Sequence, residues 1–185
     1  GALALRLAGA IALSAVRRMS PVALLGCGGR TYRHPPSLDR GRVFAWLHAV
    51  RRGSYDEGTS LSGRLGEAEA LLPSRGLVVV LSDLHDPDAA AALSRVALRH
   101  DVVVLLFEDP AERGGLSCGY FRAREAESGR GFVASGRDLW FDGGKVLAAL
   151  RARGISGLLV RTDGDAVPPI RRFLKERGSL WRVAR

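Results

Sequence analysis

Hydrophobic and polar positions along the chain alternate between the periods of helices and strands. In one class of segment, apolar residues recur every three or four positions, which predicts helices with one buried face. In the other class, branched apolar residues follow one another without interruption, which predicts strands covered on both faces. The predicted helices span residues 2–18, 39–53, 61–73, 87–100, 138–154 and 167–178, and the predicted strands span 21–29, 30–34, 77–87, 101–110 and 155–165.

The order of these segments predicts a single α/β domain over residues 1–185. Strands that are apolar on both faces lie between helical layers. We therefore expect a Rossmann-like, three-layer, doubly wound and mostly parallel sheet with helices on both faces. Residues 111–136 interrupt the alternation and predict a small hairpin insertion near 117–135, which turns around residues 128–131.

Several residues mark the ends of these elements. Asp39 precedes a helical pattern and is expected to be its N-cap. Asp86 is expected to cap the next helix, with Pro87 in the first helical position. Pro35 and Pro36 follow residues 30–34 and are expected to close that segment as an edge strand.

The first predicted helix is apolar but contains Arg6 and ends at Arg17. Because a bilayer span needs about 20 apolar residues, we expect a buried helix and no transmembrane segment in this chain. The chain opens on Gly1 rather than Met, so we expect it to be trimmed at its start. Cys27 and Cys118 have no CxxC spacing, which favours a reducing compartment and a cytoplasmic location.

Composition narrows the function classes only a little. Hydrophobic residues at 46% and charged residues at 25% are ordinary globular values. The net charge of +9 suggests a polyanionic partner, but the only lysines are Lys145 and Lys175, and the arginines are spread along the chain. A nucleic-acid-binding domain is expected to gather its basic residues in a stripe, so we expect no specific nucleic-acid partner.

Candidate chemistry lies where the predicted strands end, because ligands of open parallel sheets bind beyond the carboxyl ends of the strands. Thr59, in a loop before a helix, can reach the same edge. Hydroxyl and carboxylate oxygens suit Mg²⁺, Mn²⁺ or Ca²⁺. The residues that leave the strand ends are Gly26 to Gly29, Ser82 to Asp86, Glu108 to Asp109 and Thr162 to Asp165.

The residues "GTSL" before a helix, followed by "VVVLSDL", resemble the later part of a von Willebrand factor type A (vWA) domain. More closely, the chain resembles the bacterial vWA-like family of unknown function found beside MoxR-type AAA+ ATPases. In that family a helix like "ALRLAGAIALSAVRR" precedes a strand like "PVALLGCGG" and a Pro-rich turn. The resemblance covers most of the chain and rests on the order of short motifs.

The resemblance implies a metal-ion-dependent adhesion site, which vWA domains build from D-x-S-x-S on a central strand, a Thr and an Asp. Thr59 matches the Thr and Asp83 matches the Asp, with Ser82 and Asp109 as further candidate ligands. The D-x-S-x-S strand has no counterpart in the chain and is expected upstream of residue 1. We therefore expect this chain alone to bind divalent ions weakly or not at all, and its sheet to expose a hydrophobic slot.

A second assignment of the metal-binding Asp remains, because Thr162, Asp163 and Gly164 form the short sequence motif that vWA domains have at that Asp. We favour Asp83. Two further strand and helix pairs should follow the metal-site Asp, and they follow Asp83, whereas only one helix fits after Gly164.

Three function classes follow. The first, which we favour, is a non-enzymatic protein-interaction module that acts with a MoxR-type AAA+ ATPase in complex assembly or maturation, tethered to a membrane only through upstream segments. The second is a metal-dependent hydrolase or phosphoesterase that uses Asp83, His85 and Asp109. The third is a nucleic-acid-binding α/β domain.

Overall fold

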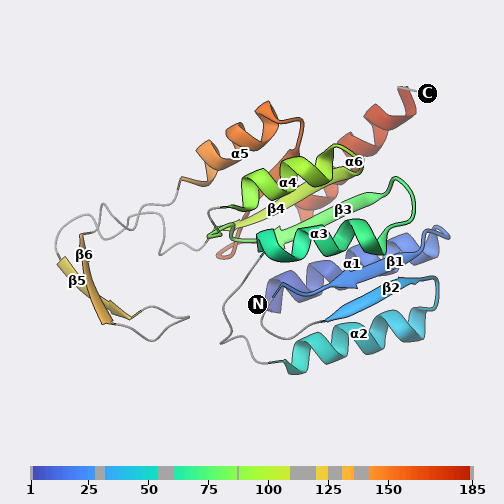
Figure 1. Cartoon of the computed structure of the whole chain (residues 1–185), viewed down its shortest axis with the longest axis horizontal. Coiled ribbons are helices and arrows are strands. Elements are labelled where there is room, and N and C mark those ends of the chain that lie inside the picture. Colours follow the sequence, from blue (N-terminus) through green and yellow to red (C-terminus); the bar gives the residue numbers. More distant parts are fainter. Residues whose placement is uncertain are drawn as a thin grey trace.

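The computed structural model describes residues 2–27, 32–53, 61–86, 88–108, 120–124, 131–135 and 142–183 (Figure 1). Helices and strands alternate through most of this chain, as the hydrophobic pattern predicts. In chain order the elements are α1 (Ala2–Arg17), β1 (Val22–Leu25), β2 (Arg33–Ser37), α2 (Arg40–Arg52), α3 (Leu61–Leu71), β3 (Leu77–Ser82), α4 (Ala89–Ala97), β4 (Asp101–Glu108), β5 (Tyr120–Arg124), β6 (Gly131–Ser135), α5 (Gly143–Ala152), β7 (Ser156–Arg161) and α6 (Val167–Val183).

The centre of the molecule is a parallel sheet with the strand order β3-β4-β7. Val80 pairs with Val104 across the first ladder, and Leu105 pairs with Leu158 across the second. Helices α3, α4 and α5 pack on the face that carries Val80, Val104 and Leu106. Helices α1 and α6 cover the face that carries Val103 and Leu105. The predicted α/β sandwich with helices on both faces is confirmed.

Helices α1 and α2 and the β1–β2 pair form a third packed cluster. Ala12 and Val16 of α1 meet Val43 and Leu47 of α2 there, with Val22 of β1 packed against them. The two strands are antiparallel and form a separate two-stranded sheet. Within the described residues, β1 pairs only with β2, and β3 pairs only with β4.

The boundaries of β2 differ from the prediction. Pro35 and Pro36 lie inside the strand, which spans Arg33–Ser37, rather than closing it. Proline has no N–H to donate, so it is tolerated in a strand that pairs on one side only. A register irregularity between Val22 and Leu24 of β1 accompanies this pairing. The segment is therefore an edge strand, as expected, but it begins and ends three residues later than the sequence suggested.

The predicted hairpin insertion is confirmed. Strand β5 pairs with β6 in antiparallel register, from Tyr120 opposite Ser135 to Arg124 opposite Gly131. The predicted closing helix is also confirmed as α6, and its first turn contains Pro168 and Pro169. Arg177 of α6 forms a largely buried ion pair with Asp101 at the start of β4, which fixes α6 against the sheet.

Candidate functional site

The candidate site lies at the edge of the sheet where β3, β4 and β7 end, called here the carboxyl edge. These three strands end at Ser82, Glu108 and Arg161. The ladders place Ser82 beside Leu106 and Glu108 beside Arg161, so β4 extends two residues further than β3. Polar residues from all three strand ends therefore occupy one side of the molecule, as the sequence predicted.

Ser82 and Asp83 form a tight turn directly after β3. The Ser82 hydroxyl accepts a hydrogen bond from the Leu84 backbone N–H at 3.0 Å and lies 3.5 Å from Asp83 Oδ1. Leu84 adopts a left-handed backbone with φ of 56°, which is unfavourable for a leucine. Its side chain packs against the core beneath α3 and α4, whereas the Asp83 side chain is 57% exposed. The turn thus presents the Asp83 carboxylate to solvent.

His85 lies close to Asp83 in the same turn. Its Nε2 lies 3.9 Å from Asp83 Oδ2, and both side chains are about half exposed. An exposed pair at this distance contributes little to stability. The polar neighbours of the Asp83 carboxylate in the described chain, Ser82 and His85, belong to its own turn, and its side chain is 57% exposed.

Asp86 connects the same turn to a distant helix. Its Oδ2 accepts a hydrogen bond from the Ser62 backbone N–H at 2.8 Å, in the first turn of α3. Its Oδ1 accepts from the Asp88 backbone N–H at 3.0 Å. The predicted role of Asp86 as N-cap of the following helix is wrong, because α4 begins at Ala89 and Asp88 holds its cap position. The N–H groups in the first turn of any helix lack acceptors within the helix. In α3, Asp86 supplies such an acceptor from another segment to the N–H of Ser62.

These hydrogen bonds hold the pKa of the Asp86 carboxyl below its ordinary value of 3.8, and the backbone N–H of Ser62 is the largest cause. A folded-state pKa below the unfolded value means that the ionised carboxylate stabilises the fold. This contribution is fully present above the unfolded pKa and is lost as the pH falls through the lowered folded value.

Asp86→Ala is expected to lower the free energy of unfolding by about 1 to 2 kcal/mol at neutral pH, because the start of α3 loses its acceptor. The difference from the unchanged chain should be smaller at an acidic pH below the lowered folded pKa, where the carboxylate is protonated in both states. Urea unfolding followed by circular dichroism at the two pH values measures both effects. Asp88→Ala is the matched control, since Asp88 makes no side-chain cap bond. A loss that is equal at both pH values would contradict the assigned role.

Glu108, one of the predicted strand-end residues, is buried at the same edge. Glu108 is the last residue of β4 and is only 6% exposed. Its Oε1 lies 3.3 Å from the point where a Cβ would be if residue 143 had a side chain in place of Gly143. It is therefore next to the first turn of α5. Its carbonyl oxygen accepts hydrogen bonds from the backbone N–H and the hydroxyl of Thr162. The strand-end pattern placed Glu108 at this edge, but no sequence signal revealed its burial.

The predicted ligands are described only in part. Ser82 and Asp83 are adjacent at the carboxyl edge, whereas Thr59 and Asp109 lie outside the described residues. Thr162 and Asp163, the competing placement, follow β7, which is separated from β3 by β4. In the part of the chain that the structure describes, no three His, Cys, Asp or Glu side chains are close enough to hold a metal ion together. Ser82 and Asp83 supply two hard oxygen donors, fewer than the ligand shell of Mg²⁺ or Ca²⁺ needs.

The first predicted helix is expected to be buried in the protein and not to span a membrane. Among the described helices, none combines the length and the apolar character needed to cross a bilayer. Helix α1 instead buries Leu7, Ala12 and Val16 within the protein.

Comparison with known proteins identifies a family but no individual relative. No curated protein and no solved structure matches the chain. The family described as "Protein of unknown function DUF58" matches residues 1–137, a span that contains α1 to β6 and both Ser82 and Asp83. Because this match covers well over half of the 185 residues, the chain belongs to the DUF58 family.

Proposed function

We propose that this chain is a non-enzymatic protein-interaction module whose carboxyl edge binds a partner through a divalent metal ion. One observation carries the proposal. The Asp83 carboxylate is exposed at the end of the parallel strand β3, in a turn that Asp86 ties to the first turn of α3. The start of α3, which follows the candidate ligand Thr59, is thus held beside the turn that carries Asp83.

The donor set suits a hard cation such as Mg²⁺, Mn²⁺ or Ca²⁺. Asp83 would supply a carboxylate oxygen, and Ser82 and Thr59 would supply hydroxyl oxygens. The resemblance to vWA-like proteins adds D-x-S-x-S from a further strand and leaves one coordination position open. A carboxylate from the partner fills that position, and the resemblance implies a MoxR-type AAA+ ATPase as the partner.

The arrangement of β1 and β3 supports a place for that further strand. Helix α1 contacts both β1 and β3 on one side of the sheet, and α3 contacts β1 and packs against Val80 of β3 on the other. Between the two strands, the described residues form no ladder. A parallel strand inserted there would join the two sheets and would bring its carboxyl end beside Asp83.

Exposure argues against the alternative of a metal-dependent phosphoesterase. Asp83 and His85 are both about half exposed, whereas catalytic pairs that activate water are held in enclosed sites. The proposal therefore predicts no hydrolysis of a general substrate such as p-nitrophenyl phosphate.

Binding of Mg²⁺ or Mn²⁺ tests the proposal, measured by isothermal titration calorimetry on the full-length product of the gene that encodes this chain. Asp83→Ala is expected to weaken metal binding at least tenfold, because it removes the one charged ligand assigned here. Asp88→Ala, an exposed carboxylate of the next turn, should leave binding unchanged. Residues 1–185 alone should bind the ion weakly or not at all, because their sequence contains no D-x-S-x-S.

Partner binding separates the interaction module from the enzyme. A MoxR-type ATPase should bind the full-length protein in Mg²⁺ and be released by EDTA, and Asp83→Ala should abolish binding in Mg²⁺. Equal metal affinity of Asp83→Ala and the unchanged protein would overturn the site. A full-length sequence without D-x-S-x-S, or phosphatase activity that Asp83→Ala abolishes, would overturn the proposed function.

A further inference from the structure

The positive charge of the chain is concentrated in its first part. Residues 1–53 contain nine arginines and one acidic residue, Asp39, so they carry a net charge of +8 out of the +9 of the whole chain. Although arginines occur throughout the sequence, those beyond residue 53 are almost balanced by acidic residues. The segment 1–53 contains α1, β1, β2 and α2, which pack together as one cluster.

The topology brings several of these arginines to one end of the molecule. Val22 at the start of β1 pairs with Ser37 at the end of β2, so the turn after α1 lies beside the turn before α2. Arg17 and Arg18 are exposed in the first turn, and Arg40 and Arg42 in the second. Figure 1 shows both turns at the end of the molecule where β3 and β4 begin, opposite the carboxyl edge. We call this end the amino edge.

Large hydrophobic side chains are exposed at the same edge. Met19 is 76% exposed in the turn after α1, while Leu38 and Phe44 are exposed around the start of α2. Leu77 begins β3, and Leu98 lies just before β4, in turns joined by the hydrogen bond from Asp101 N to Gly76 O. Both leucines are exposed. Val167, at the start of α6, is the remaining large hydrophobic side chain exposed in the described chain and lies at the carboxyl edge.

The backbone at Met19 is unusual for a residue of this size. Helix α1 ends with hydrogen bonds from Ser20 N to Ala15 O and from Met19 N to Val16 O. In this type of helix ending, the residue at the position of Met19 adopts a left-handed backbone conformation and is usually glycine. Met19 has φ of 57°, so a long apolar side chain occupies a position where it is strained and where it extends into solvent. Stability alone would favour glycine there.

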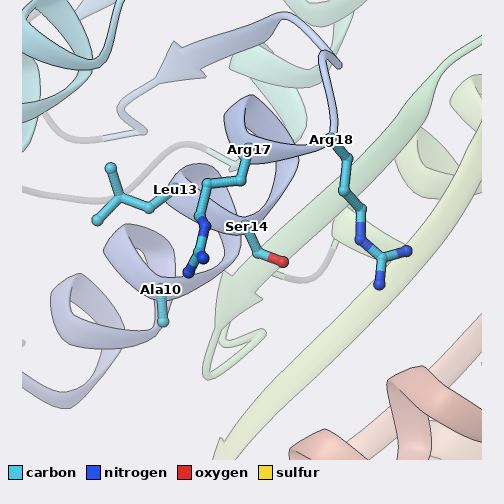
Figure 2. Close-up of a pocket in the computed structure, with 5 residues that line it drawn as sticks. All are labelled: Ala10, Leu13, Ser14, Arg17 and Arg18. Atoms are coloured by element: carbon cyan, nitrogen blue, oxygen red, sulfur yellow. The ribbon is translucent and has the colours of Figure 1, made fainter.

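A cavity of about 410 Å³ runs along the last two turns of α1 at this edge. Its lining includes Ser14, Arg17 and Arg18, and Figure 2 shows Ser14 between the two arginine side chains, which extend to either side. Guanidinium and hydroxyl groups are hydrogen-bond donors that suit a phosphate group. Basic residues also suit the negative end of the helix dipole, but that effect does not account for the exposed Met19.

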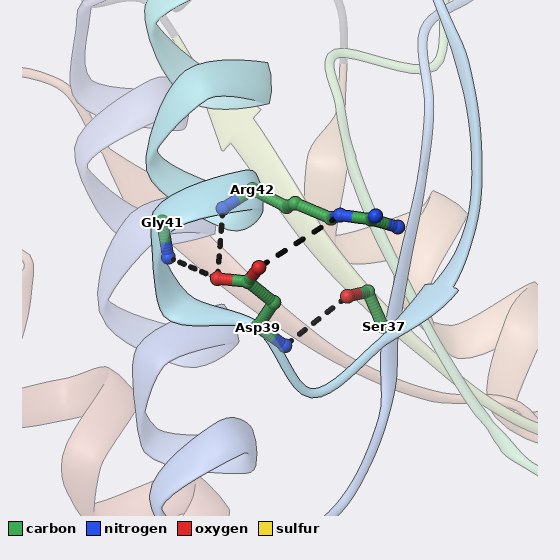
Figure 3. A network of polar contacts seen from close by, with 4 residues as sticks. All are labelled: Ser37, Asp39, Gly41 and Arg42. Carbon is green, nitrogen blue, oxygen red and sulfur yellow. Dashed lines mark hydrogen bonds and ion pairs between the residues drawn. The ribbon is translucent and has the colours of Figure 1, made fainter.

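The single acidic residue of this segment, Asp39, offsets only one of these arginines, Arg42. Asp39 Oδ1 accepts hydrogen bonds from the backbone N–H groups of Gly41 and Arg42, and Oδ2 lies 3.8 Å from Arg42 Nε (Figure 3). Its charge is therefore placed against the start of α2 and one of the arginines. The exposed carboxylates Asp83, Asp163 and Asp165 lie at the carboxyl edge instead. Of these exposed carboxylates, only Asp39 lies at the amino edge.

We propose that the amino edge is a docking surface for a membrane rich in anionic lipids. Arginines at the edge attract the negative surface, and Met19, Leu38 and Phe44 enter the headgroup region between them. Exposed apolar side chains flanked by basic ones are the combination that holds peripheral proteins on such surfaces. A nucleic acid would engage the arginines but would gain little from Met19 and Leu38. This inference is independent of Asp83 and of the proposed metal site.

Co-sedimentation with lipid vesicles tests the proposal. The protein should bind vesicles containing about one-third phosphatidylglycerol and should not bind vesicles of phosphatidylcholine alone. Arg17→Gln with Arg18→Gln should weaken binding about 25-fold, since each arginine near an anionic surface contributes about fivefold. The matched control is Arg161→Gln with Arg171→Gln, two exposed arginines at or near the carboxyl edge, which should bind as the unchanged protein does.

Met19→Gly with Phe44→Ser removes apolar surface and no charge, and it should also weaken vesicle binding on the order of tenfold. Met19→Gly alone relieves the strain of the left-handed backbone, so its unfolding midpoint should equal or exceed that of the unchanged chain. Weaker vesicle binding by this single variant therefore cannot come from unfolding. Val167→Ser, at the carboxyl edge, is the apolar control.

Three results would overturn the proposal. The first is a failure of the unchanged protein to bind anionic vesicles. The second is unchanged vesicle binding by Met19→Gly with Phe44→Ser together with loss of duplex DNA binding in the arginine variant, which would assign the surface to nucleic acid. The third is release from the vesicles by millimolar inorganic phosphate at constant ionic strength, which would identify a free-phosphate site along α1.

Discussion

Leu105→Ala is expected to lower the free energy of unfolding by about 3 to 5 kcal/mol, the largest effect that we predict for a single substitution. Leu105 lies on β4, the middle strand of the parallel sheet, and is 0% exposed. It packs with Leu7 of α1 and Ile170 of α6, so truncation leaves a cavity that three elements must close. Domains of this size are stable by about 5 to 15 kcal/mol, so the variant should be marginally folded.

Urea unfolding monitored by circular dichroism measures this loss. Leu98→Ala is the matched control, because it removes the same atoms from a leucine that is 89% exposed. It should change the free energy of unfolding by less than about 0.5 kcal/mol. Similar losses in the two variants would mean that the face of the sheet beneath α1 and α6 is not packed as described.

Gly157→Ala is expected to destabilise the fold by about 1 to 3 kcal/mol, although it adds only a methyl group. Gly157 lies on β7 under α5, and a Cβ there would come within 2.5 Å of Leu147 Cδ2 and 3.3 Å of the Val104 carbonyl oxygen. Leu147 is itself buried between α5 and the sheet, so its side chain has little room to move. The absence of a side chain at residue 157 therefore sets how closely α5 approaches the sheet.

Gly66→Ala provides the contrast. In α3, a Cβ at Gly66 meets no atom within 4 Å, and alanine is favoured over glycine inside a helix by about 0.5 to 1 kcal/mol. The midpoint of thermal unfolding should therefore fall for Gly157→Ala and rise for Gly66→Ala. A rise in the unfolding midpoint of Gly157→Ala would show that α5 does not lie against β7.

The elements of the fold could be predicted because their signals are local. The uninterrupted apolar run at Leu77–Ser82 predicts a strand buried on both faces, and the structure places it in the parallel sheet, although only Val80 is buried and Leu77 is exposed. Asp39 caps α2 as expected, since an N-cap is specified within three residues of sequence. Boundaries were less predictable. Proline usually ends a strand, yet Pro35 and Pro36 continue β2 because its outer edge has no partner within the described residues.

The candidate site was predictable only in outline. Strand ends of a parallel sheet meet at one edge, so Ser82 and Asp83 could be placed there from sequence. The partner of Asp86 could not, because Ser62 lies 24 residues away and no periodicity connects the two. The burial of Glu108 likewise depends on α5, which approaches from a distant part of the chain. Contacts of this kind follow from tertiary packing, which a single sequence does not specify residue by residue.

The opposite placement of the two edges has a consequence for signalling between them. Strand β3, which Asp83 follows, contains six residues, so at about 3.3 Å per residue it spans about 20 Å. With the amino edge on a bilayer, the strands stand away from the lipid surface and Asp83 lies roughly that far from the headgroups. This distance is more than two Debye lengths at physiological salt, so the field of the lipids is largely screened before it reaches the Asp83 carboxylate. Under the two proposals, membrane docking and partner binding are therefore electrostatically independent, and lipid composition should govern where the protein resides without changing how its carboxyl edge binds.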